Sequence, residues 1–263
     1  MKTNYHTHTF RCKHAMGSDD KYVRSAIMGG FQELGFSDHC PFPYDDGYVS
    51  DVRMDLPMLD GYVESVKLLK ERYADKLSIK LGLECEYFPE FAGWIDELIA
   101  EKQLDFVIFG NHFYPDDRKC EFFGRSVVDR KSLDIYLESA IEGMELKCFS
   151  YMAHPDLFMR SYAHFDKHCE EASRVICEKA ASLALPLEYN ISGAWHRDSP
   201  GEGFPHPEFW RIAAQCGCSC VIGVDAHDNR NLSSAKGVEL YDLAVAAVAK
   251  LGLNRLETIR FLR

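Results

Sequence analysis

Asn4–Thr9 (NYHTHT) is the first stretch of the chain with the pattern of a β-strand, and it carries two histidines. Residues two apart on a strand point to the same side, so we expect His6 and His8 to face together. Two imidazoles in that arrangement can bind one cation. Two hydrogen-bonded histidines in a protein core would give the same pattern, so the pair by itself leaves both interpretations open.

Further apolar runs along the chain also end in a histidine or a carboxylate. Glu84 and Glu86 share one side of such a run, where a charge is costly unless a partner such as a cation is near. His14 follows His8 after six residues and by itself would be a surface histidine. The candidate metal ligands found in this way are His6, His8, His14, His39, Glu84, His112, His154, Asp225 and His227.

Short apolar runs alternate with segments of helical periodicity, which predicts a parallel sheet. The expected strands are 4–9, 35–38, 78–87, 106–110, 149–153, 185–191 and 220–224. The expected helices are 19–34, 56–74, 91–102, 129–146, 166–183, 206–215 and 239–250. This number of units in 263 residues favours one α/β barrel domain over residues 1–263. All strands of a parallel barrel end at one face, where catalytic sites are built, so the candidate ligands should converge there.

The combination of imidazoles and carboxylates indicates the metal. Histidine and carboxylate together suit zinc, iron or manganese. The candidates are too many for one tetrahedral ion and suit two or three ions that share a bridging carboxylate. The sequence therefore predicts a cluster of two or three divalent cations, held by imidazole and carboxylate ligands.

The composition limits the partners. The formal net charge is −11, which disfavours a nucleic-acid surface, since phosphate backbones require Lys and Arg. A small anionic substrate stays possible, because bound cations reverse the local field. The N-terminus lacks the apolar core of a signal peptide and no run has the length of a membrane helix, so we expect a cytoplasmic protein without a membrane partner. Its 10 cysteines are then expected to be reduced thiols.

The ordered motifs NYHTHT, FSDH, GLE, GNHF, AHPD and GVDAH, together with His14, resemble the motif series of the polymerase-and-histidinol-phosphatase (PHP) superfamily. FSDHCPFP and the opening HTHTFRCKHAMGSDD are most similar to its histidinol-phosphatase branch. The resemblance runs from Asn4 to about Asp228. It implies a distorted (β/α)7 TIM-like barrel with the metal site at the C-terminal ends of the strands.

The resemblance also implies an assignment of ligands to three ions. The first ion would take His6, His8, Glu84 and Asp225; the second would share Glu84 and add His112 and His154; the third would take His14, His39 and His227. A metal-bound hydroxide would then attack phosphorus in line, while the cations neutralise the developing charge. No serine or cysteine nucleophile is needed in such a mechanism.

A few other polar residues are candidates for contact with substrate. Arg160 and Arg197 each follow an expected strand, and a guanidinium can pair with two phosphate oxygens. His196 could donate a proton to the leaving alkoxide or touch the substrate. Asn190 could orient a ligand or satisfy backbone groups, and Asp38 could anchor or orient the site. Each of these residues also has a structural interpretation, as a solvated loop residue or a hydrogen-bonded core residue.

The expected function is a phosphomonoesterase, and the resemblance implies L-histidinol phosphate as the small-molecule substrate, in histidine biosynthesis. A phosphatase of another small phosphomonoester is the first alternative. A PHP-type phosphodiesterase or exonuclease would need a basic track for nucleic acid, which the net charge of −11 disfavours. A metal-storing protein without activity would need no arginine near the metals.

Overall fold

Parallel strands form the centre of the molecule, in a computed structural model that describes residues 1–195 and 203–262. The first sheet has the order β1-β2-β3-β4, and the second has the order β5-β6-β7. The strands are β1 (Thr3–Asn4), β2 (Glu33–His39), β3 (Ser78–Cys85), β4 (Phe106–Phe109), β5 (Leu187–Asn190), β6 (Ser219–Gly223) and β7 (Asn254–Arg255).

Isolated parallel bridges join the two sheets. Met152 is bridged to Phe109 at the end of β4 and to Leu187 at the start of β5. On the other side, Thr7 is bridged to Ala226, shortly after β6. The sheet therefore curls, so that residues from both ends of the chain lie side by side.

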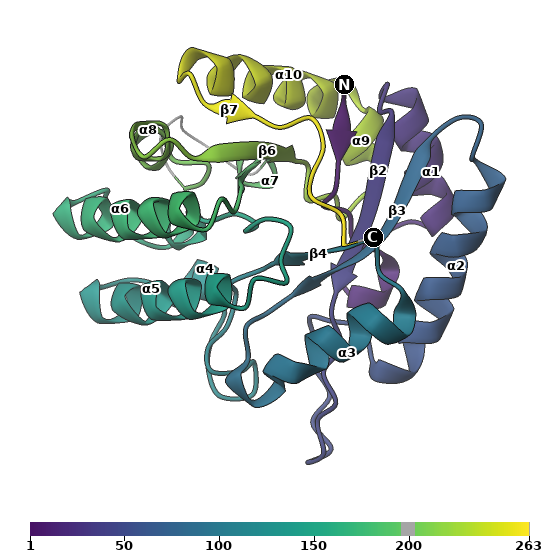
Figure 1. The fold of residues 1–263 in the computed structure, drawn as a ribbon, viewed down its shortest axis with the longest axis horizontal. Helices are drawn as coiled ribbons and strands as arrows, with labels where there is room; N and C mark the ends of the chain where they lie inside the picture. Colours follow the sequence, from purple (N-terminus) through teal and green to yellow (C-terminus); the bar gives the residue numbers. More distant parts are fainter. Residues whose placement is uncertain (196–202, 263) are drawn as a thin grey trace.

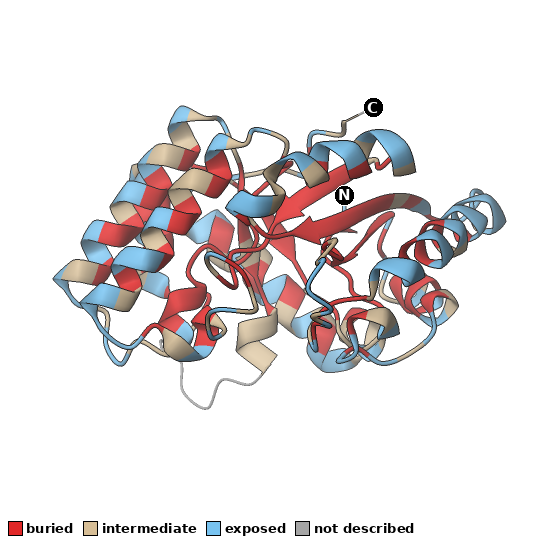
Figure 2. Cartoon of the chain, turned by 90° about the horizontal axis from the view of Figure 1, so that it is seen from below, coloured by how far each residue is buried: buried red, intermediate tan, exposed pale blue. Residues whose placement is uncertain are grey.

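Helices cover the outside of the curled sheet (Figure 1). They are α1 (Asp19–Met28), α2 (Leu59–Arg72), α3 (Ala92–Lys102), α4 (Phe123–Ser126), α5 (Arg130–Glu145), α6 (Lys167–Ser182), α7 (Ser192–Trp195), α8 (Pro207–Gln215), α9 (Arg230–Ser233) and α10 (Ala235–Lys250). Short 3-10 turns are η1 (Phe10–Cys12), η2 (Leu56–Met58), η3 (Pro89–Phe91) and η4 (Leu157–Arg160). The long helices are amphipathic: Figure 2 shows their buried faces toward the strands and their exposed faces outward.

Local chemistry fixes where the helices begin. Asp129 and Ser132 form a capping box at α5, in which each side chain accepts a hydrogen bond from the backbone N–H of the other residue. Asp166 caps α6 by accepting from the backbone N–H groups of His168 and Cys169. α1 ends before Gly29-Gly30, six residues earlier than its expected end at residue 34, because β2 already begins at Glu33.

Two of the expected strands are reduced to a two-residue strand or to isolated bridges. β1 covers only Thr3–Asn4, because the backbone beyond it bonds alternately to two neighbours. Ser37 donates to the Thr7 carbonyl, whereas His8 donates to the Ala226 carbonyl. The expected strand 149–153 is reduced to the bridges of Met152. The short β7 and the short helices α4, α7 and α9 were not predicted.

The inside of the curled sheet is filled by side chains below the site. Tyr5, Phe106, Ile108, Tyr151 and Val221 form a separate buried cluster there. Phe106 fits because Gly35 and Gly82 face it: a Cβ atom at either glycine would lie 2.6 Å from the Phe106 ring. These apolar side chains fill the part of the interior that faces the two glycines.

The remaining findings concern membranes and thiols. None of the helices in residues 1–195 and 203–262 combines the length and the apolar character that crossing a bilayer requires. All 10 cysteines are free thiols. Cys218, which belongs to the alternating cysteines 216, 218 and 220, donates to the Cys177 carbonyl at 3.3 Å.

The contact between α5 and β4 generates a stability prediction. A Cβ atom at Gly143 would overlap the Phe109 ring, so Gly143→Ala should destabilise the protein by about 1–3 kcal/mol through overpacking. Gly61 in α2 faces open space, so Gly61→Ala should be neutral or stabilising by up to about 1 kcal/mol. Urea unfolding of both variants checks this, and equal stability of the two would contradict the packing described.

Candidate metal centre

The candidate ligands converge beside one cavity. They come from the segments after β1, β4 and β6, from β2 and β3 themselves, and from the loop after Met152. The cavity has a volume of about 700 Å³ and is lined by His14, His39, Glu84, His112, His154, Asp225 and His227. His6 and His8 are fully buried beneath it. Regions far apart in the sequence thus supply one cluster of imidazoles and carboxylates.

The first group is formed by His6, His8 and Asp225, whose ligand atoms all lie within 4.8 Å of one another. His8 Nε2 lies 3.1 Å from Asp225 Oδ1, and His6 Nε2 lies 3.5 Å from the same oxygen. Glu84 Oε2 is 3.4 Å from His6 Nε2 and 3.5 Å from His8 Nε2. These are the four residues expected for the first ion.

Glu84 faces a second set of imidazoles with its other oxygen. Oε1 lies 3.0 Å from His154 Nε2 and 3.7 Å from His112 Nε2. The rings of His112 and His154 have their centroids 4.6 Å apart. The two oxygens of Glu84 therefore face different imidazoles, which is the arrangement a bridging carboxylate needs.

The third group contains His14, His39 and His227, again with all ligand atoms within 4.8 Å. His14 Nε2 and His227 Nε2 are 3.0 Å apart, and their rings are stacked. His39 connects this group to the centre, because its Nδ1 lies 3.1 Å from Glu84 Oε2.

Several ligand atoms have no hydrogen-bond partner among the described residues. They are buried, and they include His6 Nε2, His8 Nε2, Glu84 Oε2 and Asp225 Oδ1. A buried polar atom without a partner costs free energy, and here four such atoms converge. A divalent cation would satisfy all of them at once, so the residues present fit a metal.

Carboxylates and carbonyls hold the outer nitrogens of the imidazoles. His6 Nδ1 lies 2.8 Å from Glu188 Oε1, and His112 Nδ1 lies 2.7 Å from Glu86 Oε1. His14 Nδ1 lies 2.8 Å from the Cys12 carbonyl. A proton on each Nδ1 leaves Nε2 as the nitrogen for a cation, the pattern found behind most metal-binding histidines.

The electrostatics divide the imidazoles into two classes. Burial opposes protonation of His6, but the carboxylates of Glu188, Asp225 and Glu84 outweigh it and raise its pKa well above the usual value. At His8 burial is likewise outweighed, by the nearby carboxylates of Asp225 and Asp38, and the pKa rises to about 9. Burial and the neighbouring His227 and His8 instead lower the pKa of His14 to about 4.

Asp38 and Asn190 orient other groups and do not line the cavity. Asp38 is buried, accepts from the Thr9 hydroxyl and from His39 N–H, and lies 3.6 Å from His8 Nδ1. Asn190 was expected to touch substrate, but it is buried and its Nδ2 donates to Glu188 and to Asp225. Both side chains therefore contact predicted ligands or their partners, and a contact of Asn190 with substrate stays a prediction.

Arg160 lines the cavity, with its guanidinium carbon 5.5 Å from the centre of the Phe122 ring. Arg125 from α4 lines the same cavity. Neither guanidinium has a carboxylate partner among residues 1–195 and 203–262. His196 and Arg197, the other expected substrate contacts, lie outside the described residues.

Sequence reasoning missed Glu188 and Arg53. Glu188 is a carboxylate inside an apolar strand, two residues before Asn190, and the argument used for Glu84 would have found it. Arg53 is buried on the cavity wall, where its Nε donates to Asp117 at 2.9 Å and its Nη2 lies 3.6 Å from Glu86. Its place in an irregular loop gave no periodic signal.

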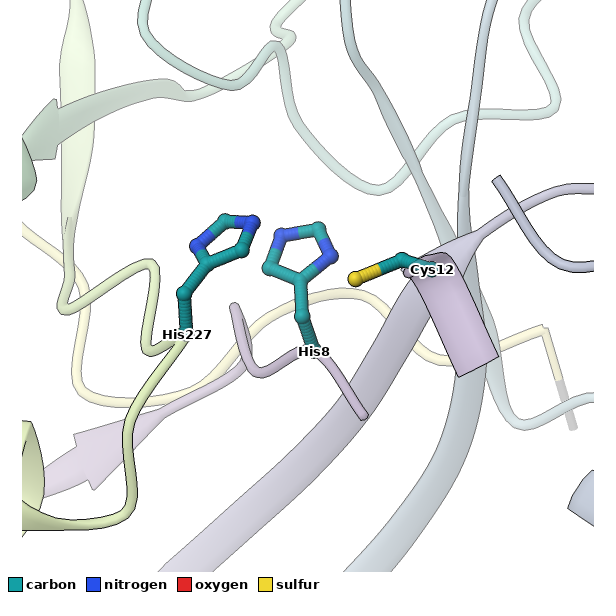
Figure 3. A group of neighbouring side chains, drawn as sticks. All are labelled: His8, Cys12 and His227. Carbon is teal, nitrogen blue, oxygen red and sulfur yellow. The ribbon is translucent and has the colours of Figure 1, made fainter. Parts of the chain in front are cut away.

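Cys12 lies beside His8. Figure 3 shows its sulfur pointing toward the His8 ring, with His227 on the other side of that ring. Sγ lies within 4.8 Å of a nitrogen of each of the two histidines. Burial raises the pKa of the Cys12 thiol, followed by the charge of Asp38, so the sulfur stays protonated and is a poor ligand at neutral pH.

These pKa directions predict how metal binding depends on pH. His8, with a pKa of about 9, is protonated at pH 7 in the metal-free protein, and so is His6. Zinc must displace these protons, so affinity at this group should rise from pH 6 to pH 9. His14, with a pKa of about 4, is already neutral throughout that range.

Zinc titration calorimetry in buffers of different ionisation enthalpy checks this prediction. We expect proton release at pH 7 for the wild type and for His14→Ala, and less release for His8→Ala. Binding of zinc at pH 7 without proton release would contradict the assigned protonation states.

The chain has relatives among known proteins. The chain is 28% identical over 229 residues to a probable histidinol-phosphatase of Deinococcus radiodurans, which covers 84% of this chain and 85% of the relative. It is 29% identical to a probable histidinol-phosphatase of Schizosaccharomyces pombe, over 97% of this chain and 89% of the relative.

The fold is similar to that of histidinol phosphate phosphatase from Lactococcus lactis, whose crystal structure contains zinc, L-histidinol and phosphate. The TM-score is 0.76 at 20% identity, over 100% of this chain and 99% of that one. This likeness confirms the predicted α/β fold with a curled parallel sheet. The PHP domain model matches residues 4–190. The chain therefore belongs to the PHP domain family.

Proposed function

We propose that the protein is a metal-dependent phosphomonoesterase that hydrolyses L-histidinol phosphate to L-histidinol and phosphate. The observation that carries the proposal is Glu84, whose two buried oxygens face separate groups of imidazoles beside a cavity lined by Arg125 and Arg160. The choice of substrate is supported by two relatives with histidinol-phosphatase names that align over most of this chain.

We propose about three divalent ions, of zinc, iron or manganese. His6, His8, Glu84 and Asp225 would hold the first, Glu84, His112 and His154 the second, and His14, His39 and His227 the third. The grouped ligand atoms and the buried atoms without partners support this assignment. When bound, such ions supply Lewis acidity that activates water and neutralises phosphate charge.

The protein's own side chains would bind and orient the ester. Arg160 and Arg125 are cations on the cavity wall, suited to the phosphate oxygens. Phe122 and Trp195 line the same cavity and offer flat apolar faces to an imidazole ring. Two predicted roles stay predictions: His196 as the proton donor to the leaving alkoxide, and Arg197 as a further contact with phosphate.

The finer architecture is also part of the proposal. We infer one domain over residues 1–263 and a distorted (β/α)7 barrel, with the metals at the C-terminal strand ends. The bridges at Met152 and between Thr7 and Ala226 support a closed arrangement. The cytoplasmic location expected from the sequence stays a prediction.

Substrate preference tests the function directly. Protein purified without chelator and assayed with added manganese or zinc should release phosphate from L-histidinol phosphate, with at least a tenfold higher kcat/KM than from other small monoesters. Activity should disappear on chelation and return with metal. Cleavage of a nitrophenyl diester in place of the monoester, or preference for another monoester, would overturn the substrate assignment while keeping the metal site.

Two variants separate metal binding from phosphate binding. Glu84→Ala removes both oxygens from the shared position, so activity should fall at least about a hundredfold together with metal content. Arg160→Met should retain the metals and raise KM about ten- to a hundredfold, from the loss of a charged hydrogen bond worth about 1.5–3 kcal/mol.

Arg174→Met is the matched control, because Arg174 is a partly exposed arginine of α6 that pairs with Glu170 of the same helix and does not line the cavity. We expect it to match the wild type. Full activity of Glu84→Ala, or an unchanged KM for Arg160→Met, would contradict the roles assigned.

A further inference from the structure

Glu188 in β5 is a buried carboxylate that connects three of the predicted metal ligands. Its Oε1 lies 2.8 Å from His6 Nδ1. Its Oε2 accepts from the backbone N–H of His154 at 3.0 Å and from Asn190 Nδ2 at 2.8 Å. Asn190 Nδ2 in turn lies 3.2 Å from Asp225 Oδ2. One side chain thus fixes groups from three different segments of the chain.

The backbone provides a fitted place for this carboxylate. Gly223 on the neighbouring strand β6 lies directly beside it, and a Cβ atom there would overlap Glu188 Oε1. Glu188 is fully buried. A buried charge is retained in such a place only when its hydrogen bonds compensate for the lost hydration.

The bond to His154 acts on a strained backbone. His154 has φ +28° and Asp225 has φ +52°, values that residues other than glycine rarely adopt. The N–H of His154 donates to Glu188, and the side chain of Asp225 accepts from Asn190, which Glu188 also holds. The carboxylate therefore stabilises both unusual conformations at the positions where ligands are presented.

We propose that Glu188 is a positioning residue that fixes the proton of His6 on Nδ1. Nε2 of His6 is then free to face Glu84 and Asp225. Glu188 thus determines whether the group that contains His6 can hold its cation. Part of this inference, that His6 binds a metal, rests on the proposed function. The fixed tautomer itself follows from the hydrogen bonds of Glu188.

Replacement by glutamine shows why the charge is required. All three groups around Glu188 are donors, and a carboxylate accepts from all of them, but an amide has one acceptor oxygen and one donor nitrogen. If the amide oxygen serves His154 and Asn190, the NH2 faces His6 and forces its proton onto Nε2. If the amide is turned, its NH2 meets two donors. Either orientation disturbs the presentation of ligands.

The experiment compares the wild type, Glu188→Gln, Glu188→Asp and the control Glu33→Gln. Glu33 is also a buried glutamate in a central strand, and it accepts from the hydroxyls of Tyr5 and Ser78, away from the ligands. Zinc affinity and equivalents per chain are measured by competition with a chromogenic chelator. The 15N shifts of the histidines in the zinc-loaded wild type report which nitrogen of His6 carries the proton.

We expect Glu188→Gln to lower the affinity for part of the bound zinc by about ten- to a hundredfold. The zinc equivalent held by His14, His39 and His227 should stay bound. Glu188→Asp should recover part of this loss because it keeps the charge, and Glu33→Gln should bind zinc like the wild type even if its melting temperature falls. His6 of the wild type should carry its proton on Nδ1.

A proton on Nε2 of His6 in the wild type, or unchanged zinc affinity in Glu188→Gln, would overturn the proposal. If Glu188→Gln does not fold, the proposal is still tested by the 15N shifts of the wild-type histidines and by the zinc affinity of Glu188→Asp. A wild type that binds zinc with the expected tautomer but leaves histidinol phosphate intact would refute the proposed function alone.

Discussion

Burial of Glu84 among imidazoles is the constraint on which the rest of the structure depends. The carboxylate is 1% exposed, and burial opposes its ionisation, but His6, His112 and His39 lower its pKa well below the usual value. An ionised carboxylate in the interior is tolerated only with positive charge around it. Without metal, protons on His6 and His8 supply that charge. Protons and cations therefore compete for one set of atoms.

The fold supplies this arrangement by separating apolar from polar side chains along the strands. Phe106, opposite Gly35 and Gly82, fills the lower interior, so the carboxylates of β3 and β5 can gather only above it. The positive φ angles of His154 and Asp225 cost about 1–3 kcal/mol each. Such strain persists because the surrounding hydrogen bonds hold the backbone in these conformations. Strain of this kind is typical of a functional site, where some stability is lost.

Much of the site was predictable because strand ends and ligand chemistry are local signals. A histidine or carboxylate directly after an apolar run marks a strand end, and parallel strands bring those ends together. The strand at His6 was overestimated because alternating side chains do not reveal that Ser37 and Ala226 share its hydrogen bonds. Glu188 was missed because it stands alone in its apolar run, whereas Glu84 has Glu86 on the same side of its strand. Arg53 was missed because its partners Asp117 and Glu86 are distant along the chain.

The distribution of charge explains how an acidic protein can receive a phosphate ester. The net charge of −11 repels anions at long range, but at 0.15 M salt this field is screened beyond about 8 Å. At the cavity the local charges decide, and there Arg160 and Arg125 have no carboxylate partner among the described residues, whereas Arg53 is neutralised by Asp117 and Glu86. Cations held by Glu84 and Asp225 would add further positive charge next to these arginines. A small anion is therefore favoured inside the cavity, while a long polyanion would also meet the acidic outer surface. The charge distribution thus favours a small phosphate ester over nucleic acid.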